Sequence, residues 1–221
     1  MIVLLDMGIG NLLSVSSGFQ RVGAETVVVG SGEDWEQLLK ERSDISGVVL
    51  PGVGAFGDAM FQLRAAGLLN VVREAVRYGR PLLGICLGMQ LLFSVSEEYG
   101  SHVGLGFLPG TIVRFQGDIK VPHMGWNSLS QVVEHPLLKN VNKGDYVYFV
   151  HSYYAQLQDP SNLLAAADYE GKLVPAVVAK QNVFGTQFHP EKSGAVGEKI
   201  LQNYVDICQT WQAEQGGKVH G

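Results

Sequence analysis

Cys86 is the residue whose surroundings most clearly indicate chemistry, because it stands between Gly84 and Gly88. An apolar run over residues 81–85 precedes it, and a helix-like run over residues 89–93 follows it. This strand–turn–helix order is typical of a nucleophile elbow, a sharp turn that lifts its side chain out of the sheet. Glycine avoids clashes at the strained backbone angles of such a turn, and a helix N-terminus favours the thiolate. The sequence therefore predicts that Cys86 is a nucleophile.

A nucleophilic thiol needs a base, and His189 is the histidine whose context fits that role best. It follows a β-like segment over residues 183–188 and is separated from Glu191 by one proline. Residues two apart in extended backbone point to the same side, so His189 and Glu191 can face one site. Glu191 would fix the imidazole tautomer, and the other ring nitrogen would take the proton of Cys86. His123 and His151 lack a carboxylate two residues later and are candidates only to line the site.

An acyl-transfer site also needs backbone N–H groups that stabilise the developing oxyanion. Leu87 supplies one directly after the nucleophile, as nucleophile elbows arrange. Gly52 and Val53 follow a predicted strand, whose carboxyl end would meet the same crevice in a parallel α/β sheet. Glycine at this point lets the backbone turn a second N–H inward, which contributes ~3 kcal/mol of transition-state stabilisation in comparable sites.

The first half of the chain alternates strand-like and helix-like segments, and this order predicts the scaffold. Strands buried on both faces are expected from short, mainly apolar runs at residues 2–5, 26–29, 45–50 and 81–85. Helix-like segments cover residues 11–22, 35–39, 60–63 and 68–78. The order predicts an α/β fold with a central, mostly parallel sheet and helices on both faces.

The second half contains short β segments joined by turns, so additional β-hairpins are expected there. The segments cover residues 111–115, 127–133, 146–154, 163–169, 174–179 and 182–188. A last long helix begins near Ser193 as N-cap, and Cys208 lies in its apolar stripe, where we expect core packing. We predict one domain over residues 1–213 and a disordered tail over residues 214–221.

Composition narrows the possible function classes. The 221 residues, 46% hydrophobic and 17% charged, suit one domain with a sizeable core. A formal charge of −5 without a basic stripe argues against nucleic-acid binding, and no apolar stretch approaches the ~20 residues that span a bilayer. Two distant cysteines and no signal peptide lead us to expect a cytoplasmic protein. We expect no cofactor and no metal, because the Gly8–Gly10 segment lacks a third glycine and no cluster has metal-ligand spacing.

Taken together, these residues resemble the class I glutamine amidotransferases, whose glutaminase uses a Cys-His-Glu triad on a flavodoxin-like sheet. The segments at residues 84–90 and 189–191 look like the two hallmark motifs of that family, and the likeness spans nearly the whole chain. Further segments narrow the resemblance to the family's separate glutaminase subunits, at residues 6–12, 51–56, 122–127 and 149–153. The resemblance implies the flavodoxin-like fold of this family.

The resemblance also implies a role for each matching position in the reaction. Cys86 would attack the side-chain amide of L-glutamine, His189 would protonate the departing ammonia, and Glu191 would orient His189. Water would then hydrolyse the glutamyl thioester. The mobile oxyanion strand would contain Gly52 and Val53.

Substrate contacts are implied by the same resemblance. Gln90 lies one helical turn after Cys86, on the same side, and would hold the substrate glutamine. Glu98 would bind the ammonium group of the substrate. Ser152 and Tyr153 would contact its amino-acid end through their backbone.

A partner is implied as well, namely a (βα)8-barrel cyclase subunit that forms a heterodimer with this chain and uses the ammonia. Trp126 would lie near the interface, and partner binding would turn the Val53 peptide into the oxyanion hole. Alternatives are the glutaminase of another amidotransferase, such as the one serving pyridoxal phosphate synthesis, and an elbow-cysteine hydrolase of the stress-protein type. A non-catalytic flavodoxin-like binding module, with Cys86 incidental, is the alternative outside the enzymes.

Overall fold

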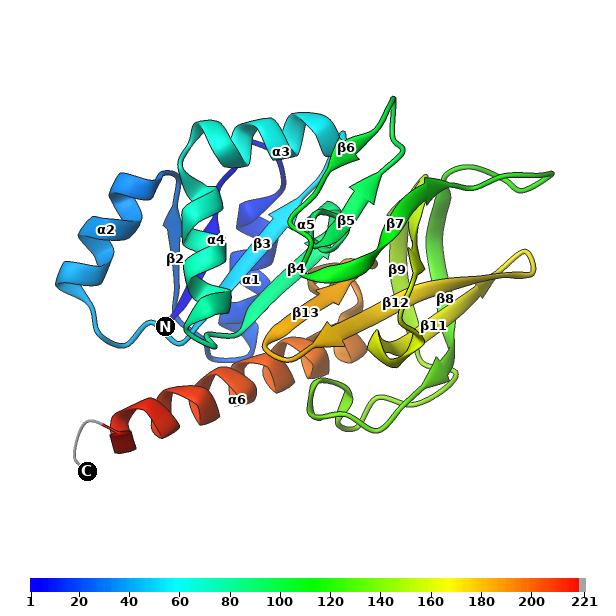
Figure 1. Cartoon of the computed structure of the whole chain (residues 1–221). Coiled ribbons are helices and arrows are strands. Elements are labelled where there is room, and N and C mark those ends of the chain that lie inside the picture. The colour runs from blue at the N-terminus through cyan, green and yellow to red at the C-terminus, as the bar shows by residue number, and fades with distance from the viewer. Residues whose placement is uncertain (219–221) are drawn as a thin grey trace.

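A nine-stranded sheet forms the centre of the computed structural model, which describes residues 1–218 (Figure 1). In spatial order its strands are β2 (Thr26–Val29), β1 (Ile2–Leu5), β3 (Gly47–Gly52), β4 (Leu82–Cys86), β13 (Val183–Thr186), β12 (Lys172–Lys180), β11 (Leu163–Tyr169), β8 (His123–Val132) and β9 (Tyr146–His151). Neighbouring strands from β2 to β13 are parallel, and those from β13 to β9 are antiparallel. The predicted α/β fold, with a parallel first half and hairpins in the second, is confirmed.

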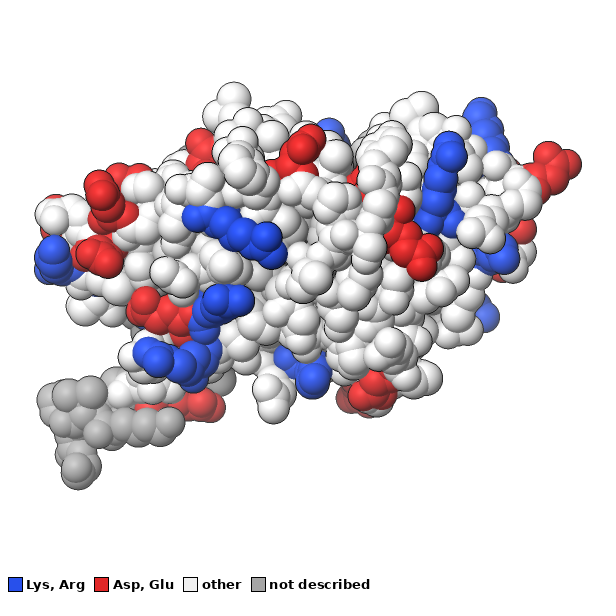
Figure 2. Space-filling view, turned by 45° about the horizontal axis from the view of Figure 1, so that its top comes forward, with Lys and Arg blue, Asp and Glu red and all other residues white. Residues whose placement is uncertain are grey.

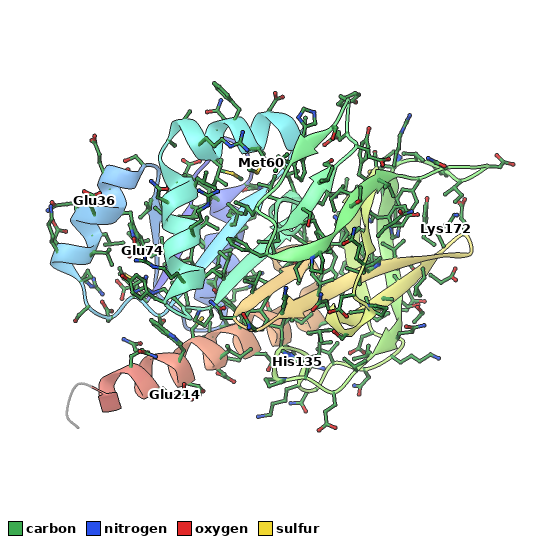
Figure 3. All side chains as sticks on the ribbon, viewed as in Figure 1. Glu36, Met60, Glu74, His135, Lys172 and Glu214 are labelled. Carbon is green, nitrogen blue, oxygen red and sulfur yellow. The ribbon has the colours of Figure 1, made fainter. Side chains whose placement is uncertain are left out.

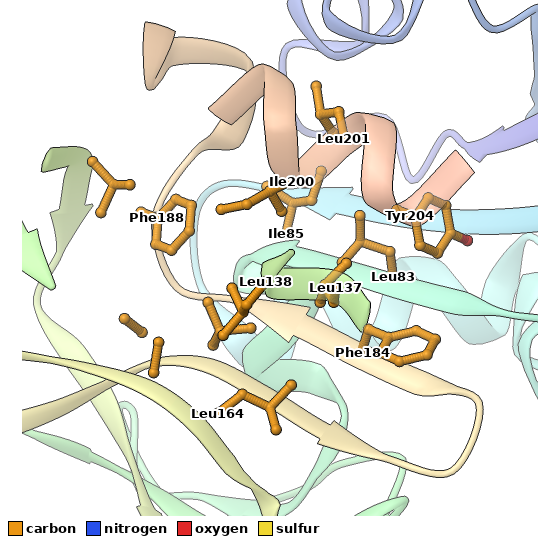
Figure 4. Packing of buried hydrophobic residues seen from close by; sticks show 14 of the residues in the cluster. Leu83, Ile85, Leu137, Leu138, Leu164, Phe184, Phe188, Ile200, Leu201 and Tyr204 are labelled. Carbon is orange, nitrogen blue, oxygen red and sulfur yellow. The ribbon is translucent and has the colours of Figure 1, made fainter. Parts of the chain in front are cut away.

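Helices cover both faces of the parallel part of the sheet (Figure 1). One face carries α1 (Leu12–Arg21) and α6 (Gly194–Lys218), and the opposite face carries α2 (Gly32–Glu41), α3 (Phe56–Ala65) and α4 (Leu68–Arg77). Figure 4 shows the core beneath α6, where Leu83 and Ile85 of β4 pack near Ile200 and Tyr204. Leu82 of the same strand belongs to the opposite core. The strand is apolar throughout because both of its faces are buried.

A second, four-stranded sheet within the described residues lies against the α3 and α4 side of the molecule. Its order is β10 (Tyr153–Leu157), β7 (Leu108–Arg114), β5 (Phe93–Ser96) and β6 (His102–Val103). The single β segment predicted over residues 146–154 is wrong, since the chain leaves the large sheet at Ser152 and enters the small one. The sequence does not reveal this change, because both strands keep a β-like pattern across it.

The long helix α6 extends to Lys218. Residues 214–218 are therefore helical where the sequence predicted a disordered tail, and residues 219–221 lie outside the described residues. Adding a turn to an existing helix costs less than starting one, and Ala213 and Glu214 are good helix formers. Trp211 also anchors this part of α6, since the guanidinium carbon of Arg80 lies 5.2 Å from its ring centroid. Cys208 packs in the core as predicted, and burial raises the pKa of its thiol to about 12.

Short 3-10 helices complete the described structure, namely η1 (Pro136–Leu138), η2 (Pro160–Asn162) and η3 (Pro190–Lys192). The β11–β12 hairpin reaches its tip near Lys172 (Figure 3). On the face seen in Figure 2, Lys and Arg side chains are interspersed with Asp and Glu and form no continuous stripe. Within residues 1–218, no helix has both the length and the apolar character that crossing a membrane requires.

Candidate active site

Cys86 occupies a sharp turn between β4 and α5 (Leu87–Leu91). Its φ of 55° and ψ of −108° are unusual for a residue with a side chain, and such strain is typical of functional turns. A Cβ atom on Gly84 would lie 2.6 Å from the carbonyl carbon of Gly88, and one on Gly88 would overlap the carbonyl oxygen of Leu50. The two glycines are therefore needed because α5 approaches β3 and β4 so closely. The chain forms the predicted elbow.

His189 and Glu191 form a buried pair that interacts with Cys86. Nδ1 of His189 lies 2.8 Å from Oε1 of Glu191, and the two side chains are 5% and 2% exposed. Burial lowers the pKa of His189, but hydrogen bonding and charge at Cys86 and Glu191 outweigh it and raise this pKa to about 10. The imidazole is therefore protonated at pH 7. Its buried Nε2 has no hydrogen-bond partner among residues 1–218, so that proton is available to a bound substrate.

Residues that the sequence analysis did not identify hold this pair in place. The Ser193 hydroxyl donates to the His189 carbonyl at 2.7 Å and accepts the Tyr148 N–H at 3.0 Å. Ser193 directly precedes α6 as predicted, but its hydroxyl fixes the segment that carries the histidine. Arg21 of α1 donates to the Glu191 carbonyl at 3.1 Å. A serine two residues after the predicted glutamate was the available signal, and only the fold shows its partners.

Gln90 of α5 stands between the elbow and the opposite wall of the site. Its Nε2 donates to the Tyr153 carbonyl at 2.9 Å and to Oε1 of Gln187 at 3.1 Å. Both hydrogens of this amide are bonded within the protein, so Gln90 supports the strand that carries Tyr153. Gln187, which the sequence analysis missed, is buried, and its Nε2 lies 3.9 Å from the Cys86 sulfur. Its signal was a polar residue two positions before His189 in an otherwise apolar strand.

A cavity of about 340 Å³ adjoins the elbow. Predicted site residues line it from several elements, namely Val53, Cys86, Leu87, Gln90, Glu98, Ser152 and Tyr153. Gly52 does not line it but pairs with Cys86 in the register of β3 and β4, which places Val53 at its edge. His189 and Glu191 are buried outside the lining. The fold thus assembles segments that are up to 100 residues apart, from Val53 to Tyr153.

Glu98 provides the acidic group of the cavity. It accepts the N–H of Phe56, the first residue of α3, at 2.7 Å. Burial raises the pKa of Glu98, and this hydrogen bond partly offsets that effect. A substrate ammonium group would favour the ionised carboxylate, because opposite charges stabilise each other most where water is scarce. Glu98 therefore lies where the predicted ammonium contact requires it.

The histidines left without a role by the sequence analysis occupy different positions. His151 lines the cavity, as considered there, whereas His123 lies behind it and pairs with His151. Within residues 1–218, no cluster of His, Cys, Asp and Glu side chains is arranged to bind a metal ion. A thiol, an imidazolium and a carboxylate beside a small cavity can carry out acyl transfer from an amide.

A family model described as "Glutamine amidotransferase class-I" matches residues 3–207. This chain belongs to the class I glutamine amidotransferase family, which confirms the predicted family and enzyme class. It is similar to imidazole glycerol phosphate synthase subunit HisH of Halobacterium salinarum, with 51% identity over 94% of this chain and 93% of that protein. The protein of the same name from Geobacillus thermodenitrificans is 53% identical, over 94% of this chain and 96% of that one.

Solved structures support the fold at lower sequence identity. A putative GMP synthase protein from Thermoplasma acidophilum has a TM-score of 0.71 at 19% identity, over 97% of this chain and 96% of that one. The structure of PurLQS from Thermotoga maritima has a TM-score of 0.71 at 21% identity, over 93% and 97% of the chains. The flavodoxin-like amidotransferase fold predicted from the sequence is confirmed.

Proposed function

We propose that this chain is the glutaminase subunit of imidazole glycerol phosphate synthase in histidine biosynthesis, and that it hydrolyses L-glutamine to glutamate and ammonia. The observation that carries the proposal is the elbow Cys86 beside the buried His189–Glu191 pair. Identities of 51% and 53% to HisH subunits, over nearly the full length of each chain, support the synthase in particular. Glutaminases of other amidotransferases would share the triad and not this overall identity.

The reaction follows from the positions of these groups. The Cys86 thiolate attacks the side-chain amide carbon of glutamine, and the backbone N–H groups of Leu87 and Val53 stabilise the oxyanion. His189 gives its Nε2 proton to the leaving nitrogen, so the C–N bond breaks and ammonia departs. Neutral His189 then takes a proton from water, which attacks the thioester and releases glutamate and the thiolate. Glu191 keeps the imidazole oriented throughout both steps.

Substrate recognition is proposed at the residues that line the cavity. Glu98 binds the ammonium group, and the backbone of Ser152 and Tyr153 contacts the amino-acid end of glutamine. Gln90 supports this wall through the Tyr153 carbonyl. The cavity of about 340 Å³ is large enough for one amino acid, and its acidic group selects a cationic end.

The proposed partner is the (βα)8-barrel cyclase subunit of the synthase, in a cytoplasmic heterodimer. Ammonia would pass through the barrel out of contact with water, which avoids its protonation to ammonium. The cyclase would use it to form imidazole glycerol phosphate and an aminoimidazole carboxamide ribotide. Met124 and Trp126 are exposed apolar side chains on β8 and are suited to this interface. Exposed Val53, next to Gly54 with a φ of 98°, is suited to reorient when the partner binds.

Co-purification with the barrel subunit, followed by assays with glutamine and with ammonium salt, tests this function. Cys86→Ser should abolish the glutamine-dependent reaction and leave the ammonia-dependent one intact. A glutamine-analogue electrophile should label Cys86 stoichiometrically, and Cys208→Ser is the matched control because that thiol is fully buried. Labelling without assembly on the barrel would indicate another amidotransferase. Absence of labelling in the complex would indicate a binding module.

A further inference from the structure

His123 and His151 form a buried pair that the proposed reaction does not use. They are directly opposite each other in the antiparallel pairing of β8 and β9, and they are 2% and 6% exposed. Nδ1 of His123 lies 2.9 Å from Nε2 of His151. The His123 ring is stacked against Phe149 and Tyr169, with centroid distances of 4.4 and 3.9 Å. Aromatic packing therefore holds the pair in one geometry.

The hydrogen positions in the pair follow from the partner of His151. Its Nδ1 lies 2.8 Å from the Tyr153 carbonyl oxygen, which can only accept, so Nδ1 carries the hydrogen. In a neutral imidazole the other nitrogen accepts, so Nε2 of His151 accepts from Nδ1 of His123. Nε2 of His123 is then an acceptor and faces Nδ2 of Asn127 at 3.2 Å. A directional row of hydrogen bonds thus runs from Asn127 to the Tyr153 carbonyl.

Both ends of this row support the same direction. The Asn127 amide is oriented by its own contacts, since Oδ1 accepts the Ser128 N–H at 2.8 Å and Nδ2 donates to the Asp168 carbonyl at 2.8 Å. Burial lowers the pKa of His123 to about 4. Burial, with a smaller effect of the neighbouring His123, lowers the pKa of His151 to about 3. Both rings are therefore neutral at pH 7, as the row requires.

The row ends in the cavity wall, at the point where the chain passes from the large sheet to the small one. The Tyr153 carbonyl accepts a second hydrogen bond from Gln90 at 2.9 Å. The Ser152 carbonyl accepts the N–H of Phe115 at 3.3 Å. Both carbonyls of this segment are thus bonded to the protein. The orientation of the two peptide groups depends on these contacts, and His151 supplies one of them.

We propose that His123 and His151 are positioning residues for glutamine binding, which hold the Ser152–Tyr153 wall of the cavity through the Tyr153 carbonyl. This inference rests on the proposed function, because it concerns the same substrate site. β8 carries both His123 and the exposed Met124, so the pair also connects the cavity wall to the strand with the proposed partner-facing side chains.

Two substitutions of His151, measured in the complex with the barrel subunit, separate this role from simple packing. His151→Asn places an amide nitrogen near the position of Nδ1 and keeps a donor for the Tyr153 carbonyl, whereas His151→Gln places it near Nε2 and removes that donor. Loss of one such hydrogen bond corresponds to about a fivefold change in binding. We expect the KM for glutamine to be about fivefold higher for His151→Gln than for His151→Asn, with a smaller difference in kcat. His135→Asn, near η1 and α6 (Figure 3), is the control.

The ratio of the two KM values decides the outcome. A ratio of about three or more supports the positioning role, and a ratio near one overturns it, whatever happens to kcat. If thermal unfolding shows that His151→Gln is not folded, His123→Leu and His123→Asn are compared by the same criterion, because only Asn keeps a donor toward His151. Glutamine-dependent activity of the wild-type complex is measured in parallel. Its absence refutes the proposed function, whereas an active wild type with equal variants refutes the positioning role alone.

Discussion

Replacement of Glu191 by Gln removes a negative charge from a buried pair and hardly changes the side-chain volume. Nδ1 of His189 and Oε1 of Glu191 are 2.8 Å apart, and both side chains are almost fully shielded from water. A hydrogen bond between charged groups in such a place contributes about 1.5–3 kcal/mol. Each 1.36 kcal/mol corresponds to about a tenfold change in rate, so kcat/KM for glutamine should fall about 10- to 150-fold.

The assay is glutamine hydrolysis by the complex as a function of pH, with the ammonia-dependent synthase reaction as the control. Glu191 helps to raise the pKa of His189 to about 10, so Glu191→Gln lowers this pKa. Protonated His189 is the general acid, and activity should therefore decline at a lower pH in the variant than in the wild type. A loss of less than about threefold with an unchanged pH profile would refute the idea that Glu191 stabilises the imidazolium.

Other predictions concern packing, substrate binding and stability. A Cβ atom on Gly197 would overlap the carbonyl oxygen of Pro190, so Gly197→Ala should lower the free energy of unfolding in urea by about 1–3 kcal/mol, and an unchanged midpoint would contradict the packing. Glu98→Gln keeps an acceptor for the Phe56 N–H and loses the charge, so the KM for glutamine should rise about 10-fold or more, and an unchanged KM argues against the ammonium contact. The raised pKa of His189 contributes stability that is fully present below pH 6.5 and is lost as the pH rises through about 10. Unfolding free energy should fall more between pH 7 and 10 in the wild type than in His189→Gln, and equal decreases would contradict this.

Local sequence was sufficient where a short segment determines its own geometry. The elbow at Cys86 was predictable because only glycine fits at residues 84 and 88, where α5 approaches β3 and β4. His189 and Glu191 were predictable as a pair because a spacing of two brings their side chains to one side. The parallel strands were predictable because burial on both faces requires apolar residues throughout.

Contacts between distant segments were beyond the reach of sequence patterns. Gln187 and Ser193 are polar residues of ordinary appearance, and their roles arise from partners such as Cys86 and Tyr148 in other elements. The change of sheet at Ser152 leaves the β pattern intact on both sides. The helical course of residues 214–218 depends on the turns of α6 that precede them.

The sequence by itself determined the nucleophile, its histidine and carboxylate, and the α/β scaffold, because each of these follows from backbone geometry over a few residues. Tertiary structure decided which groups those residues meet. It raised the pKa of His189 through buried neighbours and placed Glu98 on the first N–H of α3. It also joined His123 and His151 across two strands. Burial and hydrogen-bond direction depend on the surrounding atoms in three dimensions, and no spacing along the chain encodes them.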